Sequence, residues 1–571
     1  MKVGFKAAAG AAVLALAVAA CGGGGSNGES GKPNAEASKQ AQEQAAALPK
    51  SSMGAADYAS VKDGGTLKLA MTQFKTQWNY NQVNGTQTDV ADVTDLLLPA
   101  FKADENAEVF NNPDYISEWK MEMQGDKEVV TYKINDKATW SDGTPITYKD
   151  FQAQWKALNG SDDKYQVTST DGYDRIGSVE KGASDKDVVV TFKKSYPDWK
   201  GLFSPLYPAS TNETPAGFNK GWINKMPVTA GPFKLDDIDA TAKTVTLVRD
   251  DKWWGQKAKL DKVIFRAMDD SATPNAFANG EIDAYKLSIN AANLKRAKGV
   301  PNTDIRMAAG PDWRQFTING SSPMLKDKNV RQAVINYGLN RDALIQSDLK
   351  DMDWPVQALN NHVYMNTQKG YQDNAGDLAK YNPEKAKQLL DAAGWKLDGE
   401  YRKKDGKELN LRCLIPSGTQ TTQQECELTQ AMLKEIGVKV TLYTVPIDTW
   451  DVDHLIPGDF EIAPFSWLGT PFPIPGLTQF FKTPKSKDNF ANNFPRIGNP
   501  ELDAKIDETA GEMDPDKAIQ LANEVDKMVW DEVHTLPLYQ RPQIVAAKKT
   551  LANYGAKGFS SIDWTKVGFT G

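Results

Sequence analysis

Side chains that could carry out acid–base or metal chemistry are few and widely spaced in this sequence. Its 571 residues contain three histidines, His362, His454 and His534, and three cysteines. From residue 61 onward, no C-x-x-C, H-E-x-x-H, G-x-S-x-G or P-loop pattern gives the spacing of a zinc site, a nucleophilic serine or a phosphate loop. Paired carboxylates for glycoside hydrolysis stay open as an alternative among 74 acidic residues. The residue types favour a binding protein, without metal or cofactor, over an enzyme.

Aromatic side chains are the more abundant material for a site. The chain has 15 tryptophans, and rings of this size often line ligand clefts as well as cores. The net charge of −7 provides no positive field for nucleic acid. With 40% hydrophobic and 25% charged residues, the composition is that of a globular protein, and the length suggests two to four domains.

Strand and helix patterns alternate along the chain without a fixed repeat. Residues 66–71 alternate apolar and polar side chains after a glycine turn, which predicts a strand. Asp327 can cap a helix that runs to Tyr337, and Asn382 with Pro383 marks the start of another. A further helix is predicted from about residue 423 to Gly437, followed by a strand. This alternation predicts an α/β or mixed fold built on sheets.

The N-terminus indicates export. Lys2 and Lys6 precede the apolar run 7–20, which is too short to span a bilayer but fits a secretory signal. The run ends in Val-Ala-Ala and then Cys21, which resembles a bacterial lipobox; an ordinary signal peptide with a chance cysteine is the alternative. We therefore expect a signal peptide over 1–20, a lipid anchor at Cys21 on the extracytoplasmic face of the cell membrane, and a flexible tether over 21–60, which has few large apolar side chains.

The remaining two cysteines, Cys413 and Cys426, lie in a predicted strand and in the helix that follows it. In an exported protein such a pair can form a disulfide that closes a short loop. Two buried thiols are the alternative.

Residues 140–147, Trp-Ser-Asp-Gly-Thr-Pro-Ile-Thr, resemble the hallmark of the family 5 extracellular solute-binding proteins, which serve ABC importers for oligopeptides, dipeptides and nickel. Ser-Asp-Gly reads as a turn, and Thr147 with Asp150 reads as a capping box, so the motif is interpreted as architectural and not as the ligand site. Four further stretches resemble the family in the same order along the chain: residues 230–233, 316–341, 381–395 and 535–539.

The resemblance implies a two-lobed, periplasmic-binding-protein-like α/β fold with mixed sheets, flanking helices and a hinge of two crossovers near Pro311 and Pro537. It implies the following division: a first lobe over 61–311 with an extra subdomain over 96–225, a second lobe over 312–535, and a return to the first lobe over 536–571.

The resemblance also implies a ligand site with one departure from the family pattern. In the peptide-binding members a strand carries a tryptophan, and an aspartate three residues later pairs with the α-ammonium of the peptide. Here Ser466 and Trp467 are in place, but Thr470 stands at the position of the aspartate. A hydroxyl supplies no charge. Either a nearby acid, Asp448 or Asp451, substitutes, or the ligand is not an ordinary peptide with a free amine.

Other aromatic residues are candidates because of where the family's cleft lies. Trp78 and Tyr80 follow the first strand, Tyr165 lies in the extra subdomain, and Tyr539 lies at the second crossover. For each of them the alternative is a structural role, in the core or in a surface loop.

The resulting expectation is a monomeric binding lipoprotein that captures a ligand, preferably an oligopeptide, between two lobes and delivers it to an ABC permease. The alternatives are an oligosaccharide, a metal chelate or a signalling ligand on the same fold, and a secreted enzyme.

Overall fold

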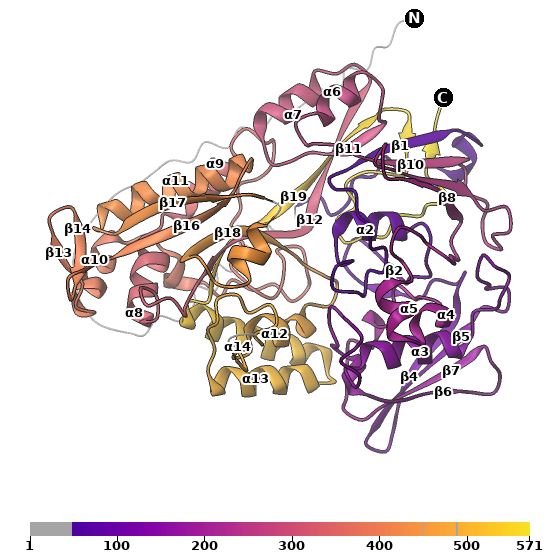
Figure 1. Cartoon of the computed structure of the whole chain (residues 1–571), viewed down its shortest axis with the longest axis horizontal. Helices are drawn as coiled ribbons and strands as arrows, with labels where there is room; N and C mark the ends of the chain where they lie inside the picture. Colours follow the sequence, from indigo (N-terminus) through magenta and orange to yellow (C-terminus); the bar gives the residue numbers. More distant parts are fainter. Residues whose placement is uncertain (1–47, 448, 487–488) are drawn as a thin grey trace, which may run out of the picture.

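A ten-stranded mixed sheet runs through the computed structural model, which describes residues 48–571 apart from 448, 487 and 488 (Figure 1). Its strands, in spatial order, are β17 (Lys439–Val445), β16 (Asn410–Pro416), β18 (Ile462–Leu468), β12 (Thr303–Ile318), β19 (Thr535–Lys548), β11 (Ala284–Lys286), β1 (Thr66–Met71), β10 (Lys262–Ala267), β9 (Thr244–Arg249) and β8 (Phe233–Asp239). The expected signal peptide, the expected lipidation at Cys21 and the tether up to residue 47 lie outside the described residues.

The two long antiparallel strands β12 and β19 join the halves of this sheet. At one end β19 pairs with β11, and at the other end β12 pairs with β18. The pairing of β12 with β19 is interrupted between Ala309, which pairs with Pro542, and Trp313, which pairs with Gln540, so Gly310 and Pro311 have no ladder partner. Proline donates no ladder hydrogen bond, so a break in the register is expected here. We call this break the hinge, the side that holds β1 and β8–β11 the first lobe, and the side that holds β16–β18 the second lobe.

The first lobe carries a separate four-stranded sheet (Figure 1), whose strands fall inside the range expected for the extra subdomain. Its order is β4 (Ile116–Gln124), β5 (Lys127–Ile134), β7 (Asp187–Phe192) and β6 (Ile176–Lys181), and it packs with α3 (Tyr148–Leu158), α4 (Ala209–Asn212) and α5 (Pro215–Lys220). Thr147 and Asp150 form the predicted capping box of α3. The buried Asp150 carboxylate also accepts hydrogen bonds from Trp140 Nε1 (3.2 Å) and Ala209 N (2.8 Å), which supports an architectural role for this motif.

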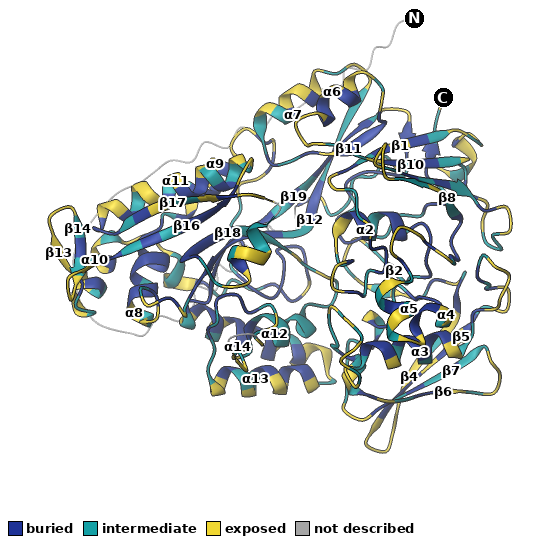
Figure 2. Cartoon of the chain, in the orientation of Figure 1, coloured by how far each residue is buried: buried dark blue, intermediate teal, exposed yellow. Residues whose placement is uncertain are grey.

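The second lobe has two groups of helices. The helices α9 (Arg341–Leu349), α10 (Pro383–Ala392) and α11 (Gln420–Glu435) pack in one apolar cluster with β16 and β17, whereas α12 (Pro473–Phe481), α13 (Pro500–Gly511) and α14 (Pro515–Glu532) form another (Figure 1). The exposed residues of α13 lie on the side of the helix away from the sheet, whose central strands are buried (Figure 2). Asn382 and Pro383 begin α10 as predicted.

The predicted helix after Asp327 differs from the expectation. Asp327 caps a short helix, α8 (Lys328–Arg331), but residues 332–337 continue as a π-helix, so the two do not form one regular α-helix.

A disulfide between Cys413 in β16 and Cys426 in α11 confirms the predicted pairing, with Cα atoms 5.8 Å apart. It ties the helix to the sheet inside the core of the second lobe, where both sulfurs are fully buried.

Residues 48–57 differ from the flexible tether that composition predicts. Leu48 is 5% exposed, the carbonyl of Pro49 accepts a hydrogen bond from Ala309 N (2.7 Å), and Ser52 pairs with Ala556 in both directions. The buried Arg306 guanidinium donates to the carbonyl of Met53 (3.2 Å) on this segment. Backbone hydrogen bonds to β12 and to the C-terminal segment replace the apolar side chains that the segment lacks. We call residues 48–57 the strap.

The core does not divide at residue 311. The helices α6 (Thr273–Ala278) and α7 (Ala291–Lys298), which the sequence assigns to the first lobe, pack in the same apolar cluster as α9–α11. Since the sheet is continuous across the hinge, the lobe boundary at residue 311 stays a prediction about which parts of the chain move as one body. No helix within the described part of the chain combines the length and the apolar character needed to cross a membrane.

Candidate ligand site between the two lobes

The ends of strands from both lobes approach the hinge. In the second lobe β18 ends at Leu468, which pairs with Asp312 on the hinge strand β12. In the first lobe β11 ends at Lys286, which pairs with Val545 on β19. Ligands of α/β proteins bind beyond the carboxyl ends of strands and between domains. The space beside the hinge is therefore the candidate site.

Trp467 lies in a cluster of aromatic side chains at the end of β18. Its ring stacks on Phe494 with centroids 5.5 Å apart and planes 5° apart, and it meets Phe480 at 4.7 Å and Phe465 at 5.1 Å. Trp467, Phe465 and Phe480 are partly exposed. Partly exposed, mutually supported rings provide an apolar wall whose geometry is set before a ligand arrives.

Thr470 stands at the end of this wall, but its hydroxyl is already engaged. Thr470 Oγ1 donates to the carbonyl of Phe472 (2.8 Å) and accepts from Phe472 N (3.2 Å), and the Thr470 carbonyl accepts from Gln368 Nε2 (3.1 Å). These bonds hold the turn that leads into α12. Of the two predicted substitute acids, Asp451 accepts a hydrogen bond from Val452 N (2.9 Å) and Asp448 lies outside the described residues.

Two ion pairs lie at the hinge side of the site, and we call their four members the hinge charge cluster. Lys286 Nζ is 2.6 Å from Asp92 Oδ2, and Arg541 Nη1 is 3.6 Å from Asp312 Oδ2. Burial raises the pKa of Asp312, against the opposing charges of Arg541 and Lys286. Asp92 comes from α2 (Thr88–Thr94) in the first lobe, whereas Asp312 and Arg541 lie on the hinge strands. Charged side chains from the first lobe and from the hinge strands therefore lie close together.

Tyr80 belongs to the surroundings of this cluster. It is partly exposed, and burial together with the negative charge of Asp92 raises the pKa of its phenol. A hydrogen bond from Tyr80 N to Tyr207 Oη (2.7 Å) holds the backbone of Tyr80 in place. Among the predicted aromatic residues of the first lobe, Tyr80 is the one whose electrostatic neighbours reach the hinge.

The lobes also touch away from the hinge. Arg175 Nη1 in the extra subdomain donates to the carbonyl of Ala510 (3.0 Å) at the C-terminal end of α13. Gly201 lies against the ring of Phe472, so closely that a Cβ at this glycine would come within 3.0 Å of the ring. We call the Arg175–Ala510 contact the latch. Contacts on this side together with the hinge hold the two lobes close to each other.

Two of the predicted site residues are fully buried. Trp78 lies in the core of the first lobe, where its N donates to the carbonyl of Trp222 (3.1 Å). Tyr539 lies under the hinge, where its hydroxyl donates to Asp348 Oδ2 (3.0 Å). In this conformation the structure brings neither side chain to the aromatic wall.

The other two occupy different positions. Tyr165 packs on Phe218 inside the extra subdomain at a centroid distance of 5.5 Å, and its hydroxyl donates to the carbonyl of Asn212 (3.1 Å). Ser466 lies directly beside Trp467 on β18, and its buried Oγ has no hydrogen-bond partner among the described residues. Ser466, Trp467 and Thr470 are therefore together, while Tyr165 is apart from them.

Sequence reasoning missed the hinge charge cluster. Its signal was the sequence Gly310-Pro311-Asp312 and, on the partner strand, Arg541-Pro542: a charged residue beside a strand breaker in each case. It also missed a buried bidentate pair in which Arg314 Nε donates to Glu425 Oε1 (2.8 Å), which ties the hinge strand β12 to the disulfide-bonded helix α11.

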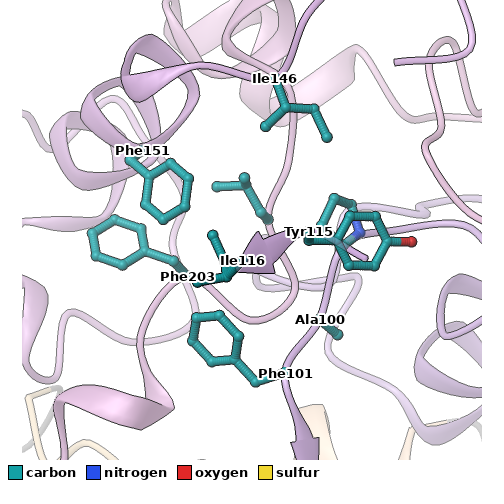
Figure 3. A pocket seen from close by; sticks show the side chains of 9 residues that line it. Ala100, Phe101, Tyr115, Ile116, Ile146, Phe151 and Phe203 are labelled. Carbon is teal, nitrogen blue, oxygen red and sulfur yellow. The ribbon is translucent and has the colours of Figure 1, made fainter. Parts of the chain in front are cut away.

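A cavity inside the first lobe is too small to hold a ligand of the kind expected from the sequence. Phe101, Tyr115, Ile116, Phe151 and Phe203 are among the side chains around it (Figure 3), and its volume is about 10 Å³. That is the space of one water molecule. Within the described part of the chain, no group of three or more His, Cys, Asp or Glu side chains is placed to hold a metal ion.

Comparison with known proteins gives consistent results. The chain is 39% identical over 524 residues to the oligopeptide-binding protein OppA of Mycobacterium tuberculosis, covering 90% of this chain and 86% of that protein. It is 27% identical over 447 residues to the oligopeptide-binding protein OppA of Bacillus subtilis, covering 74% and 78%.

Solved structures share the fold. A periplasmic EDTA-binding protein, EppA, matches with a TM-score of 0.82 and 26% identity, covering 91% of this chain and 98% of that one. The oligopeptide-binding protein AppA of Bacillus subtilis, in complex with a nonapeptide, matches with a TM-score of 0.77 and 21% identity, covering 90% and 100%. These matches confirm the two-lobed binding-protein fold.

The family model of bacterial extracellular solute-binding proteins, family 5, matches residues 112–489, which include the turn motif at Trp140, the strand that carries Trp467 and the hinge strand β12. With this match, the fold and the mycobacterial relatives in agreement, the chain belongs to family 5 of the bacterial extracellular solute-binding proteins.

Proposed function

We propose that this protein captures an oligopeptide between its two lobes and delivers it to the permease of an ABC importer. The observation that carries the proposal is the 39% identity, over 90% of the chain, to proteins named oligopeptide-binding protein OppA. The aromatic wall at Trp467 and the hinge charge cluster support it, because a peptide presents both apolar side chains and charged ends.

Capture needs no chemical step. A ligand that contacts both lobes stabilises the closed arrangement over an open one by the difference in its affinity for the two. The latch and the Gly201–Phe472 contact are the parts of the interface that separate when the lobes part, whereas β12 and β19 stay paired. The permease then receives the closed, loaded form.

We further propose that the protein is a monomer anchored through Cys21. Family 5 proteins are extracytoplasmic, and two acyl chains on a cysteine give a stable anchor. Changing Cys21 to Ser is expected to release the protein into the medium. Retention of this variant in the membrane fraction would contradict the anchor.

A metal chelate is the second candidate ligand. The neighbour that binds EDTA has the TM-score of 0.82 and 26% identity, and a chelate would need cations such as Arg541 and Lys286 for its carboxylates.

Native mass spectrometry of the protein purified without refolding separates these possibilities. Peptide masses released on denaturation are the expected result. A single non-peptide mass that carries a metal isotope pattern would replace the peptide with a chelate. If the protein is empty, thermal-shift measurement against peptide and chelate collections decides, since a ligand at 100 times its Kd stabilises by about 2.7 kcal/mol.

A further inference from the structure

A peptide that is enclosed between the lobes brings a charged α-ammonium into a shielded space, and that charge needs an acceptor. The hydroxyl of Thr470 uses its hydrogen and one lone pair within its own turn, and it carries no charge. The acceptor must therefore be sought elsewhere around the site. This question rests on the proposed function.

Asp312 lies next to Leu468, two residues before Thr470, although 156 positions separate Asp312 and Leu468 in the sequence. It pairs with Leu468 across the β12–β18 ladder, and Gly469 N donates to the carbonyl of the preceding residue, Pro311 (2.8 Å). The ladder thus places Asp312 at the end of β18, one position beyond the Trp313–Trp467 pair and on the other face of the sheet from the Trp467 ring.

The environment of Asp312 combines shielding with access. Its side chain is 39% exposed, yet burial raises its pKa, so the carboxyl group is bordered partly by protein and partly by water. Its ion pair with Arg541 has an N–O separation of 3.6 Å, which is too long for a hydrogen bond. No hydrogen bond within the described chain uses its oxygens, so both can accept from a ligand.

Other acidic side chains near the hinge have fewer free oxygens that could accept a hydrogen bond from a ligand. Asp92 is in contact with Lys286 at 2.6 Å, and Asp348 is buried and accepts from Tyr539. Asp89 accepts from Thr72 N (3.2 Å), Thr72 Oγ1 (2.6 Å) and Gln73 N (3.0 Å). Asp312 alone among these four combines exposure with oxygens that lack a hydrogen bond in the described structure.

We propose that Asp312 binds the α-ammonium of the captured peptide and that Arg541, on the paired hinge strand, positions its carboxylate. The ligand class is then a peptide with a free amino end, held where the two lobes join. Since the acceptor lies on the hinge itself, the amino end contacts a region that both lobes share.

The test uses the full chain and a pool of casein-derived peptides, offered either unmodified or N-acetylated. Bound peptides are identified by mass spectrometry, and the most abundant one is titrated calorimetrically in both forms. The wild-type protein is expected to retain the unmodified pool and to lose at least tenfold in affinity for the acetylated peptide. Asp312→Asn is expected to lose at least tenfold in affinity for the free-amine peptide and to bind the acetylated peptide as the wild type does. Asp312→Glu is expected to recover part of the lost affinity.

Asp304→Asn is the matched control, because Asp304 lies on the same strand and pairs with Arg306 away from the hinge. Thermal melting of each variant reports folding. Equal binding of acetylated and free peptides by the wild type would overturn the role of Asp312 and leave the proposed function intact. An equal loss for both peptides in a folded Asp312→Asn variant would also overturn it. Failure of the wild type to bind either pool would overturn the proposed function, and the role of Asp312 with it.

Discussion

At the scale of single residues, the aromatic wall depends on Trp467. Its ring is parallel to Phe494 and is flanked by Phe480 and Phe465, so it has one supported face and an exposed remainder. Such a ring is held in place without a ligand, and little conformational entropy is lost when one binds.

Changing Trp467 to Ala is therefore expected to weaken peptide binding at least tenfold, or about 1.4 kcal/mol, because the stacking surface is lost. Titration calorimetry with a peptide recovered from the wild-type protein measures the effect. Trp467→Phe, which keeps an aromatic surface, should lose less. Unchanged affinity in the alanine variant would remove Trp467 from the site.

Glu128, on β5 beneath the latch, predicts a pH effect. Its side chain is buried and burial raises its pKa to about 7, which the hydrogen bond from Tyr196 N and the charge of Arg175 only partly oppose. Between pH 4.5 and 7 the folded protein holds a proton that the unfolded chain has lost, so this residue makes the free energy of unfolding fall as the pH rises.

Glu128→Gln removes this titration. Urea unfolding from pH 4.5 to pH 8 should show a shallower decline for the variant than for the wild type, and a higher stability for the variant above pH 7. Parallel curves for the two proteins would show that Glu128 does not cause the decline.

Residue-level sequence reasoning succeeded where a local pattern carries the information. The spacing of Thr147 and Asp150 predicted a capping box that the structure contains, whereas the ligand-binding roles of Trp467 and Thr470, which the family resemblance implied, stay predictions. Asp312 could not be found in this way, since its neighbour Leu468 is brought to it by strand register and not by sequence distance.

At the scale of elements, the helix α11 links the disulfide to the hinge. Cys426 and Glu425 are adjacent on it; the first is bonded to β16 and the second is paired with Arg314 on β12. The position of this helix therefore affects the hinge strand through a buried charge, and a buried arginine that loses its partner is costly.

Replacing Cys413 and Cys426 together with Ala is expected to lower the free energy of unfolding by about 3 kcal/mol, the chain-entropy value for a loop of this length. Denaturant unfolding measures the loss. The wild-type protein treated with a reductant should show the same shift of its transition as the double variant, and a transition that reduction leaves in place would contradict the prediction.

The latch predicts an effect on ligand release. Arg175→Ala removes the hydrogen bond to Ala510, and a charged hydrogen bond contributes about 1.5–3 kcal/mol. We expect ligand dissociation to be about tenfold faster with a smaller change in the association rate, measured by stopped-flow fluorescence. Lys194→Ala, at an exposed position of the same subdomain, is the control. Equal dissociation rates in the two variants would show that the latch does not retain the ligand.

Elements with strong end signals were predictable, and those shaped by tertiary packing were not. Asn382 and Pro383 mark the start of α10 in any context. The π-helix at 332–337 carries ordinary helical residues, so its wider turn reflects packing and leaves no local trace. Gly310 and Pro311 likewise predict the end of a strand. In the structure the register with β19 shifts at these residues, but pairing with β19 on both sides keeps β12 one continuous strand.

At the scale of the whole molecule, the strap binds the first lobe to the hinge. Removing residues 48–57 is expected to lower the free energy of unfolding by about 2 kcal/mol, because Leu48 loses its burial and the buried Arg306 loses an acceptor. Removing residues 22–47 alone is the matched control. Equal thermal melting of the two truncated proteins would show that the strap does not contribute to stability.

The overall architecture was predictable through the order of several motifs, but the continuity of the sheet was not. Each motif predicts a local strand or helix, and the resemblance to family 5 that the motifs carry together implied two lobes with a hinge. That α6 and α7 share a core with the second lobe follows from contacts between residues far apart in the sequence, which no local pattern encodes.

The strap also determines where any attachment through the N-terminal side would act. Pro49 contacts Ala309, next to the interruption in β12, so the chain that precedes Leu48 joins the folded body beside the pivot. In a rotation, points near the axis travel least and the outer rims travel farthest. A force applied through this end would therefore act near the hinge axis and not on the outer part of either lobe. Such an attachment would leave both lobes able to rotate.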